Sequence, residues 1–378
     1  MANQLSLFGD SPITPPPTEG IKYAGSKLKI LPRILELAKK TGAERILDGF
    51  AGTTRVSQAF AKQGYSVFSN DTSVWSEVFA TCYLLNERPQ EHYQELIDHL
   101  NSVKPFAGWF TKHYGGTCKN GSAVQDDGLK KPWQKHNTEK LDGIRQEIEN
   151  LSLGKIERAV ALTSLVLALD RVDNTLGHFV SYLKDWSPRS YKNLRLRVPE
   201  IFPNINGIHK VYRQNILQLA PSLPVDLAYF DPPYGSNNEK MPPSRVRYAS
   251  YYHLWASVCL YDQPELFGKA QRRKDTSDKV TGSIFEDFRK DSSGSYLAVS
   301  AIEQLIKSTQ AEWIMLSYNS GGRATAEELN EVVRRNGHLE EVVELDHKRN
   351  VMANMKWTGE WLRDAEEPNR EFLFLIHK

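Results

Sequence analysis

The stretch from residue 44 to 71, ERILDGFAGTTRVSQAFAKQGYSVFSND, constrains the fold more than any other part of the chain. It reads as a strand, a glycine-containing loop, a helix and a second strand. Val56, Ala59 and Phe60 form an apolar stripe at helical spacing, and Gly64 marks the end of the helix. A β-α-β unit of this kind joins two parallel strands through a right-handed crossover. The chain is therefore predicted to contain a parallel sheet covered by helices.

Strands and helices alternate again after residue 205, but the region before it follows another pattern. Helical stretches over 139–150 and 156–169 lie beside a lysine- and glycine-rich segment, and residues 171–199 read as a long hairpin or an extended arm. Gly52 and Asp231 are 179 positions apart, and two or three β-α units of about 30 residues each explain only half of that. We therefore predict an α/β fold: a doubly wound, mostly parallel sheet interrupted by an inserted helical or hairpin module.

These patterns divide the chain into four parts. The first is Pro-rich and polar, which is typical of a flexible tail. The predicted parts are the tail at 1–20, a first sheet part at 21–85, the insertion at 86–205 and a second sheet part at 206–378.

The composition is that of an ordinary globular protein, with 40% hydrophobic and 25% charged residues. The sequence has no apolar run near the ~20 residues that span a bilayer and no pattern of a secretory leader. Cys82, Cys118 and Cys259 show no metal-ligand spacing, so we expect neither a metal site nor disulfides, and a reducing, cytoplasmic location. The net charge of +2 means that any polyanionic partner must be met by local basic patches.

Four candidate ligand sites fall at the ends of predicted strands, where ligands bind in open α/β sheets. They are the glycine turn Asp48–Thr54, Asp71, Asn215 and Asp231. Each of these features alone is weak evidence for a ligand site, because an acid or asparagine after a strand can simply cap a helix. The sequence lacks the G-x-x-x-x-G-K-[ST] phosphate loop, so a nucleoside-type cofactor is expected rather than a polyphosphate.

The motif DPPY, Asp231 to Tyr234, follows the apolar run VDLAYF and indicates a specific chemistry. An exocyclic amino group of a nucleobase is a poor nucleophile because its lone pair is delocalised into the ring. Hydrogen bonds from that group to the Asp231 carboxylate and the Pro232 carbonyl would favour a freer lone pair. Pro232 and Pro233 hold the backbone rigid, which is preorganisation. The Tyr234 ring offers a face on which an extruded base can stack, worth about 1–3 kcal/mol.

The sequence resembles amino-group DNA methyltransferases, most closely the D12 class of adenine-N6 enzymes of the alpha type. The likeness covers residues 21–378. It is carried by KYAGSK (Lys22–Lys27), FAGTT, Asp71, DPPY, YYHLWASV, LSYNSGG and EFLFLI. One departure is Thr54, which stands where the family's loop has its final glycine. The order of the motifs implies that target recognition lies between the cofactor motifs and DPPY.

The resemblance implies a class I, Rossmann-like methyltransferase fold and S-adenosylmethionine as methyl donor. Lys27 would lie near the carboxylate of the cofactor, Asp71 would bind its ribose, and Asn215 and Ile216 would contact its adenine. The implied catalytic residues are Asp231, Pro232, Pro233 and Tyr234. The implied cofactor-binding residues are Tyr23, Ala24, Gly25, Lys27, Asp48, Phe50, Gly52, Thr53, Asp71, Asn215, Ile216 and Asp231.

The leading functional hypothesis is a DNA adenine-N6 methyltransferase of a restriction-modification system, with a cognate endonuclease as one possible partner. Cytosine-N4 methylation is an alternative, because DPPY suits any exocyclic amine, and RNA is another substrate to consider. A catalytically silent DNA-binding regulator is the alternative outside enzymes. Methyl transfer itself needs alignment more than acid-base help, because the sulfonium is already an activated donor.

A base inside duplex DNA must be flipped out to reach a pocket at a strand end. That requires cations that clamp the backbone, and such cations gather on a segment that also carries Trp186 and Tyr191. The predicted DNA-binding residues are Lys184, Arg189, Lys192, Arg195 and Arg197. A solvated charged hairpin is the alternative reading. A second basic cluster, KAQRRK (Lys269–Lys274), is expected to lie in a loop that DNA orders.

The tail contains QLSLF, Gln4 to Phe8, which resembles the pentapeptide with which bacterial DNA enzymes dock on the replication sliding clamp. It combines a glutamine anchor and a Leu-Phe pair on a polar segment. The alternative is an incidental apolar cluster. The hypothesis is that the enzyme, of bacterial or phage type, is held near the nucleoid at newly replicated DNA.

Overall fold

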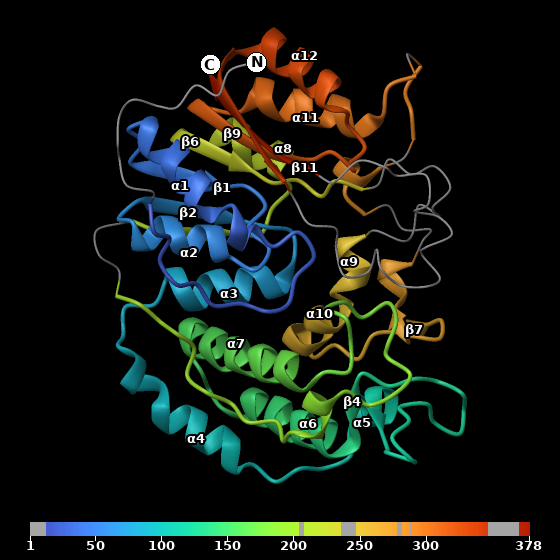
Figure 1. Ribbon diagram of the computed structural model, residues 1–378. Helices are drawn as coiled ribbons and strands as arrows, with labels where there is room; N and C mark the ends of the chain where they lie inside the picture. The colour runs from blue at the N-terminus through green and yellow to red at the C-terminus, as the bar shows by residue number, and fades with distance from the viewer. Residues whose placement is uncertain are drawn as a thin grey trace.

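A seven-stranded sheet forms the centre of the protein (Figure 1). The computed structural model describes residues 13–203, 208–235, 247–277, 282–287, 289–292, 294–346 and 370–378. From one edge of the sheet to the other, the strands are β10 (His338–Asp346), β11 (Arg370–His377), β9 (Ala311–Asn319), β6 (Val225–Phe230), β1 (Arg45–Asp48), β2 (Ser66–Asn70) and β5 (Lys210–Tyr212).

The strand order reverses beside β1. From β1 the chain continues to β2 and β5 on one side, and then crosses to β6 and β9 on the other. All neighbours among these five strands are parallel, and Leu47 of β1 pairs with Phe68 of β2 and Ala228 of β6. β11 runs antiparallel between β9 and β10. The predicted doubly wound, mostly parallel sheet is confirmed, and its reversal point opens a crevice at the carboxyl ends of β1 and β6.

Helices cover both faces of the sheet, because successive side chains of a strand point to opposite faces. Ile46 packs into a core with α1 (Leu31–Lys40) and α2 (Arg55–Lys62), while its neighbour Leu47 packs into the core on the other face. The helices of that second face are α8 (Ile216–Leu219), α11 (Leu297–Ser308) and α12 (Ala326–Asn336). Figure 1 shows these two groups of helices in blue and in yellow to orange.

A separate helical module begins with α3 and lies below α2 in the view of Figure 1. It contains α3 (Val74–Leu84), α4 (Gln94–Ser102), α5 (Trp109–Tyr114), β3 (Gly115–Gly116), β4 (Trp133–Gln134), α6 (Lys135–Asn150) and α7 (Lys155–Val172). α6 and α7 contain the two helical stretches predicted from the sequence. Its core also takes in Leu254 and Trp255, which follow the DPPY motif in sequence. The module is therefore larger than the predicted insertion at 86–205.

The segment after DPPY supplies the remaining parts of the module and of the crevice. These are α9 (Tyr248–Tyr251), α10 (His253–Leu260), and the short strands β7 (Leu266–Phe267) and β8 (Arg272–Arg273). Short 3-10 helices are η1 (Lys27–Lys29), η2 (Gln90–Tyr93), η3 (Pro188–Tyr191), η4 (Ala220–Ser222), η6 (Lys274–Thr276) and η7 (Ile284–Glu286).

The predicted flexible tail differs in the structure from what its composition suggested. Its first twelve residues, with the proposed clamp motif, lie outside the described residues. Residues 13–20 are held against the sheet part and the helical module. Arg55 donates to the carbonyls of Thr18 and Gly20, and the Glu19 carboxylate accepts from the hydroxyl of Tyr83 at 2.8 Å. Buried hydrogen bonds of this kind override the local preference of a proline-rich segment for disorder.

Within the described part of the chain, no helix is both long and apolar enough to cross a bilayer. The same residues contain no group of three or more His, Cys, Asp or Glu side chains that could hold a metal ion.

Asp173, at the end of α7, joins the sheet part to the helical module. Its side chain is 1% exposed, and Oδ1 pairs with Lys22 Nζ at 2.9 Å and with Arg189 Nη2 at 2.8 Å. Lys22 also pairs with Asp170 at 3.3 Å. One buried carboxylate therefore fixes both the segment that leads into KYAGSK and the start of the basic segment.

We expect Asp173→Ala to destabilise the protein by about 2 kcal/mol, because two partly buried cations lose their shared partner. Urea unfolding measures the effect. Asp126→Ala is the matched control, because Asp126 is 87% exposed and pairs only with the exposed Lys119. That change should cost less than about 0.5 kcal/mol. Equal losses in the two variants would contradict the role assigned to Asp173.

Candidate active site

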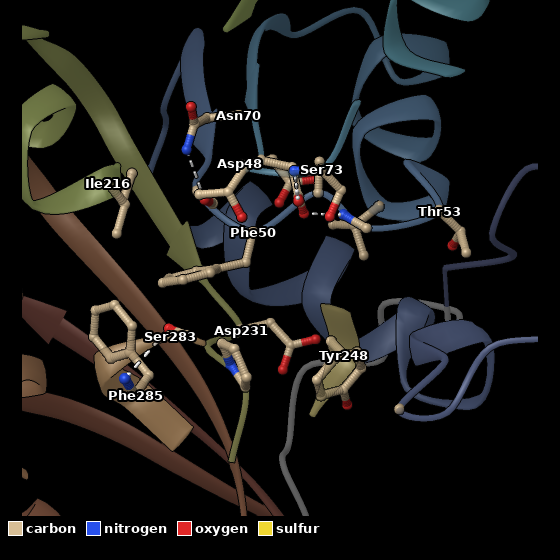
Figure 2. Close-up of a pocket in the computed structure, with 18 of the residues that line it drawn as sticks. Asp48, Phe50, Thr53, Asn70, Ser73, Ile216, Asp231, Tyr248, Ser283 and Phe285 are labelled. Atoms are coloured by element: carbon tan, nitrogen blue, oxygen red, sulfur yellow. Dashed lines mark hydrogen bonds between the residues drawn. The ribbon is translucent and has the colours of Figure 1, made fainter. Parts of the chain in front are cut away.

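A cavity of about 640 Å³ opens at the carboxyl ends of β1, β2 and β6, where the strand order reverses. Figure 2 shows Asp48 and Ser73 on one side of this cavity and Asp231 and Tyr248 on the other. The residues predicted from the sequence that line it are Tyr23, Gly25, Lys27, Asp48, Phe50, Gly52, Thr53, Asp71, Asn215, Ile216, Asp231 and Pro233. The predicted residues that do not line it are Ala24, Pro232 and Tyr234.

The loop after β1 is tied to the end of β2 through Asp71. The backbone N–H of Gly52 donates to Asp71 Oδ2 at 2.9 Å, and the N–H of Ser73 donates to Oδ1 at 2.8 Å. Gly52 has φ +48°, and a Cβ there would lie 3.1 Å from the hydroxyl oxygen of Tyr23. Glycine is needed at this point both for the left-handed backbone and for the close approach of Tyr23.

Thr54 adopts φ +62° although it is not a glycine. This left-handed conformation costs a β-branched residue roughly 1–2 kcal/mol. Its N–H donates to the Ala51 carbonyl at 2.6 Å, and its hydroxyl oxygen accepts from Gln58 Nε2 at 3.1 Å in a buried environment. These bonds stabilise the strained conformation of Thr54. The loop therefore makes the turn for which the resembling family uses a glycine.

Asp48 presents a buried oxygen that lacks a partner. The residue is 1% exposed, Ser57 Oγ donates to Oδ2 at 2.6 Å, and Oδ1 makes no hydrogen bond with the described residues. Burial raises the pKa of Asp48 to about 7, although the Ser57 hydrogen bond works against this rise. A cationic donor in the cavity would satisfy Oδ1 and favour the ionised form. The ammonium of an amino acid moiety has that chemistry.

The part of the cavity around Phe50 is apolar. Phe50 meets Phe285 edge-to-face, with ring centroids 5.1 Å apart and planes at 89°. Ile216 lies on the same side (Figure 2). Asn215 caps α8, because its Oδ1 accepts from the N–H of Leu217 at 3.0 Å. A flat heteroaromatic ring suits such a wall, with the Asp71 carboxylate nearby to accept from hydroxyl groups.

The carboxylate of Asp231 belongs to a buried network. Lys27 Nζ lies 3.0 Å from Asp231 Oδ1 and 3.0 Å from Glu371 Oε1. The Tyr234 hydroxyl contacts the same three groups: it is hydrogen-bonded to Asp231 Oδ1, lies 2.7 Å from Glu371 Oε1 and accepts from Lys27 Nζ at 2.6 Å. Asp231 Oδ2 makes no hydrogen bond with any residue that the structure describes, so this second oxygen remains for a ligand.

This network shifts the acidity of its members. Burial raises the pKa of Asp231 to about 6, with Lys27 lowering it and the like charge of Glu371 raising it. Burial disfavours the ionised form of Glu371, but Lys27 and hydrogen bonds favour that form more strongly. The pKa of Glu371 is therefore lowered. Burial disfavours the Lys27 ammonium, yet the two carboxylates hold its pKa above the usual value. At neutral pH the three groups are therefore all ionised.

Lys27 and Tyr234 are placed differently from their predicted roles. The ammonium of Lys27 is shared between Asp231 and Glu371, so it orients Asp231, and its contact with a cofactor carboxylate stays a prediction. The Tyr234 ring packs on Tyr318, with centroids 4.8 Å apart, and its hydroxyl points into the network. The aromatic side chain that lines the cavity beside Asp231 is Tyr248. Stacking of a base on Tyr234 stays a prediction.

Aromatic side chains after DPPY hold the KYAGSK segment in place. Tyr23 stacks on Tyr252 with ring centroids 4.7 Å apart, and the N–H of Ala24 donates to the Tyr252 hydroxyl at 2.7 Å. Tyr248 donates to the Ala24 carbonyl at 3.2 Å. The stretch YYHLWASV carried the family likeness, but no role for its tyrosines could be assigned from the sequence.

The five predicted DNA-binding residues fall into two groups. Lys184, Lys192, Arg195 and Arg197 are exposed and form no ion pair with the described residues. Arg189 instead pairs with the buried Asp173 and donates from Nε to the Asp173 carbonyl at 2.8 Å. Its guanidinium therefore helps to hold the module together, and its contact with DNA stays a prediction.

The segment that carries these residues is an extended arm and not a hairpin. Residues 192–203 contain neither strand nor helix. The arm is fixed to two helices through asparagines: Asn137 Oδ1 accepts from the N–H of Leu194 at 2.7 Å, and Asn101 Oδ1 accepts from that of Leu196 at 2.9 Å. Burial alternates along it, so Arg195 and Arg197 point to solvent while the leucines face the core.

The second basic cluster is partly structural. Arg273 is 6% exposed and pairs with Asp262 at 2.7 Å and with Asp275 at 2.8 Å. Lys274 pairs with Glu265 at 2.6 Å. The cluster lies on the short β7–β8 ribbon, in which Phe267 pairs with Arg272. The net positive charge of the sequence KAQRRK is therefore larger than the positive charge that the cluster presents at the surface.

Sequence comparison finds curated relatives of this chain. It is 29% identical to modification methylase StsI of Streptococcus sanguinis over 83% of this chain and 46% of that protein. It is 27% identical to modification methylase LlaI of Lactococcus lactis subsp. lactis over 91% of this chain and 54% of that protein. It is also 27% identical to the type II methyltransferase M.NlaIII of Neisseria lactamica, over 87% of this chain and 92% of that protein. The chain spans about half the length of the first two.

The model of one protein family also matches the sequence. The match covers residues 23–310, from Tyr23 in the cavity wall to the residue before β9. It includes Asp48, Asp71 and the DPPY motif, which the fold brings to one cavity. The class I arrangement of the sheet and the matched residues agree, and the chain belongs to the D12 class N6 adenine-specific DNA methyltransferase family.

Proposed function

We propose that the protein transfers the methyl group of S-adenosylmethionine to the N6 amino group of an adenine in DNA, as the modification enzyme of a restriction-modification system. One observation carries the proposal: Asp231 is fixed through Oδ1 by Lys27 and Tyr234, while Oδ2 remains for a ligand at the edge of the cavity. The family and the names of the relatives support it.

The residues present fit S-adenosylmethionine, which supplies a methyl group activated by a sulfonium. Asp48 Oδ1, buried and without a partner in the described part of the chain, would accept from the ammonium of the methionine moiety. Asp71, already oriented by Gly52 and Ser73, would accept from the ribose hydroxyls. The apolar wall around Phe50, Ile216 and Phe285 would take the adenine ring.

The chain's part in the transfer is positioning. A flipped adenine would donate its two N6 hydrogens to Asp231 Oδ2 and the Pro232 carbonyl, which favours a lone pair directed at the methyl group. Burial excludes water and strengthens these hydrogen bonds. After transfer the positively charged N6 releases a proton, and the ionised Asp231 or water accepts it. Alignment supplies much of the rate enhancement, since the donor needs no further activation.

DNA would reach this site with its backbone held by exposed cations. Lys184, Lys192, Arg195 and Arg197 are available for phosphates in the described structure, whereas Arg189 is engaged with Asp173. Each phosphate contact contributes to affinity by releasing counterions, so binding should weaken as salt increases. Action on chromosomal DNA would place the enzyme in the cytoplasm, at the nucleoid.

We further propose that Gln4–Phe8, which lies outside the described residues, docks on the replication sliding clamp. The support is the sequence pattern alone. Retention of the protein on immobilised purified clamp should be lost on changing Leu7 and Phe8 together to alanine. Unchanged retention would refute the docking. A cognate endonuclease as partner predicts that DNA treated with this enzyme becomes resistant to that nuclease.

Asp231→Ala should reduce methyl transfer at least 1000-fold, because it removes the acceptor that orients the amino group. The assay uses labelled S-adenosylmethionine and DNA amplified in vitro, which carries no methyl groups, followed by nucleoside analysis. N6-methyladenine is expected; label in cytosine, or in RNA alone, would refute the proposal. Because Asp231 must be ionised, kcat/KM should rise with pH through about 6 and level off above it.

Arg195→Glu should weaken binding of a DNA duplex about tenfold at low salt and reduce its salt dependence by about one phosphate contact. The affinity for S-adenosylmethionine should stay unchanged. The matched control is Arg334→Glu, which reverses an exposed charge on α12. Equal effects of Arg195→Glu on DNA and on cofactor binding would show that the arm does not serve as a DNA contact.

A further inference from the structure

Glu371 is the second residue of β11. It is far from Lys27 in sequence and is 1% exposed. It pairs across the sheet with Asn319 of β9. Ser317 and Asn319 are two residues apart, so their side chains share one face of β9. Ser317 Oγ donates to Glu371 Oε1 at 2.7 Å, and Asn319 Nδ2 donates to Oε2 at 3.2 Å. The neighbouring strand therefore fixes the carboxylate in one orientation.

Glu371 Oε1 then holds both groups that contact Asp231. It lies 3.0 Å from Lys27 Nζ and 2.7 Å from the Tyr234 hydroxyl oxygen, whose single proton it shares with Asp231 Oδ1. Lys27 has three N–H groups, enough for Asp231, Glu371 and the Tyr234 oxygen at once. Two carboxylates share one ammonium, so the cluster carries a net charge of −1. Without Glu371, Lys27 would be free to neutralise Asp231 alone.

We propose that Glu371 is a positioning residue for the transfer step: from β11 it holds Lys27 and Tyr234 so that Asp231 stays anchored through Oδ1 and presents Oδ2 as a strong acceptor to the target amino group. This inference rests on the proposed function. Glu371 does not line the cavity, so it would touch neither a cofactor nor a base bound there. Its effect passes through the two residues that it holds, which is preorganisation of the acceptor.

The charge of Glu371 also affects the ionisation of Asp231. The like charge disfavours ionisation, and Lys27 favours it. Removing Glu371's charge while keeping its shape should therefore lower the pKa of Asp231. The other titratable groups around Asp231 come from several elements and stay in place in such a variant. They are Asp48 of β1, Asp71 after β2, Tyr229 of β6, Tyr23 before η1 and Tyr248 of α9.

Glu371→Gln tests the proposal in the full chain. We expect kcat on unmethylated DNA to fall at least tenfold, while KM for S-adenosylmethionine changes less than threefold. The acid limb of the pH profile should move down by about one pH unit, which a purely structural role would not produce. Wild-type kcat together with an unmoved acid limb would overturn the proposal.

The control is Glu344→Gln on the adjacent strand β10, where an exposed carboxylate pairs with Arg370, next to Glu371 in sequence. It should leave both kcat and the pH profile unchanged. If Glu371→Gln fails to fold in a thermal melt, Glu371→Asp keeps the charge but retracts the carboxylate by one methylene. That variant should lose at least fivefold in kcat, and full activity would overturn the proposal. An inactive wild-type protein would instead refute the proposed function itself.

Discussion

The shared ion pair of Lys27 with Asp231 and Glu371 is the interaction on which the candidate site depends. It joins η1, the end of β6 and the start of β11, three segments that are far apart in sequence. Such a cluster is stable inside a protein only when every charge is paired and hydrogen-bonded. Ser317, Asn319 and Tyr234 supply those hydrogen bonds. The antiparallel strand β11 therefore contributes to the site as well as to the sheet.

The same cavity contains a second carboxylate arrangement on its opposite wall. Asp71 is oriented by two backbone N–H groups and keeps further acceptor sites, whereas Asp48 keeps one buried oxygen without a partner among the described residues. The two walls differ in what they can bind: the Asp48 side suits a cationic and hydroxylated ligand, and the Asp231 side suits an amino group. A two-substrate transfer needs this separation, because donor and acceptor must approach each other from different directions.

Where the contacts differ from what the sequence suggested, a buried partner that the local pattern does not show is the reason. Arg189 looked like a DNA contact because its neighbours are basic, but the buried Asp173 engages it. Lys27 looked free for a cofactor carboxylate, but Glu371 and Asp231 share it. Residues 13–20 looked disordered until Arg55 and Tyr83 bound them. Local composition indicates charge and flexibility, but it does not indicate which buried group will contact a given side chain in the fold.

The sequence by itself determined the β-α-β start, the strand positions and the residues at the strand ends, because hydrophobic periodicity and turn chemistry are local properties. It also carried the DPPY motif and the family likeness. The tertiary structure decided which of these residues meet, and it added Tyr248, Phe285 and Glu371 to the site. Those contacts depend on strand order and on the register of β11 with β9, which place Glu371 opposite Asn319. Long-range pairing of this kind leaves no local signal in the chain.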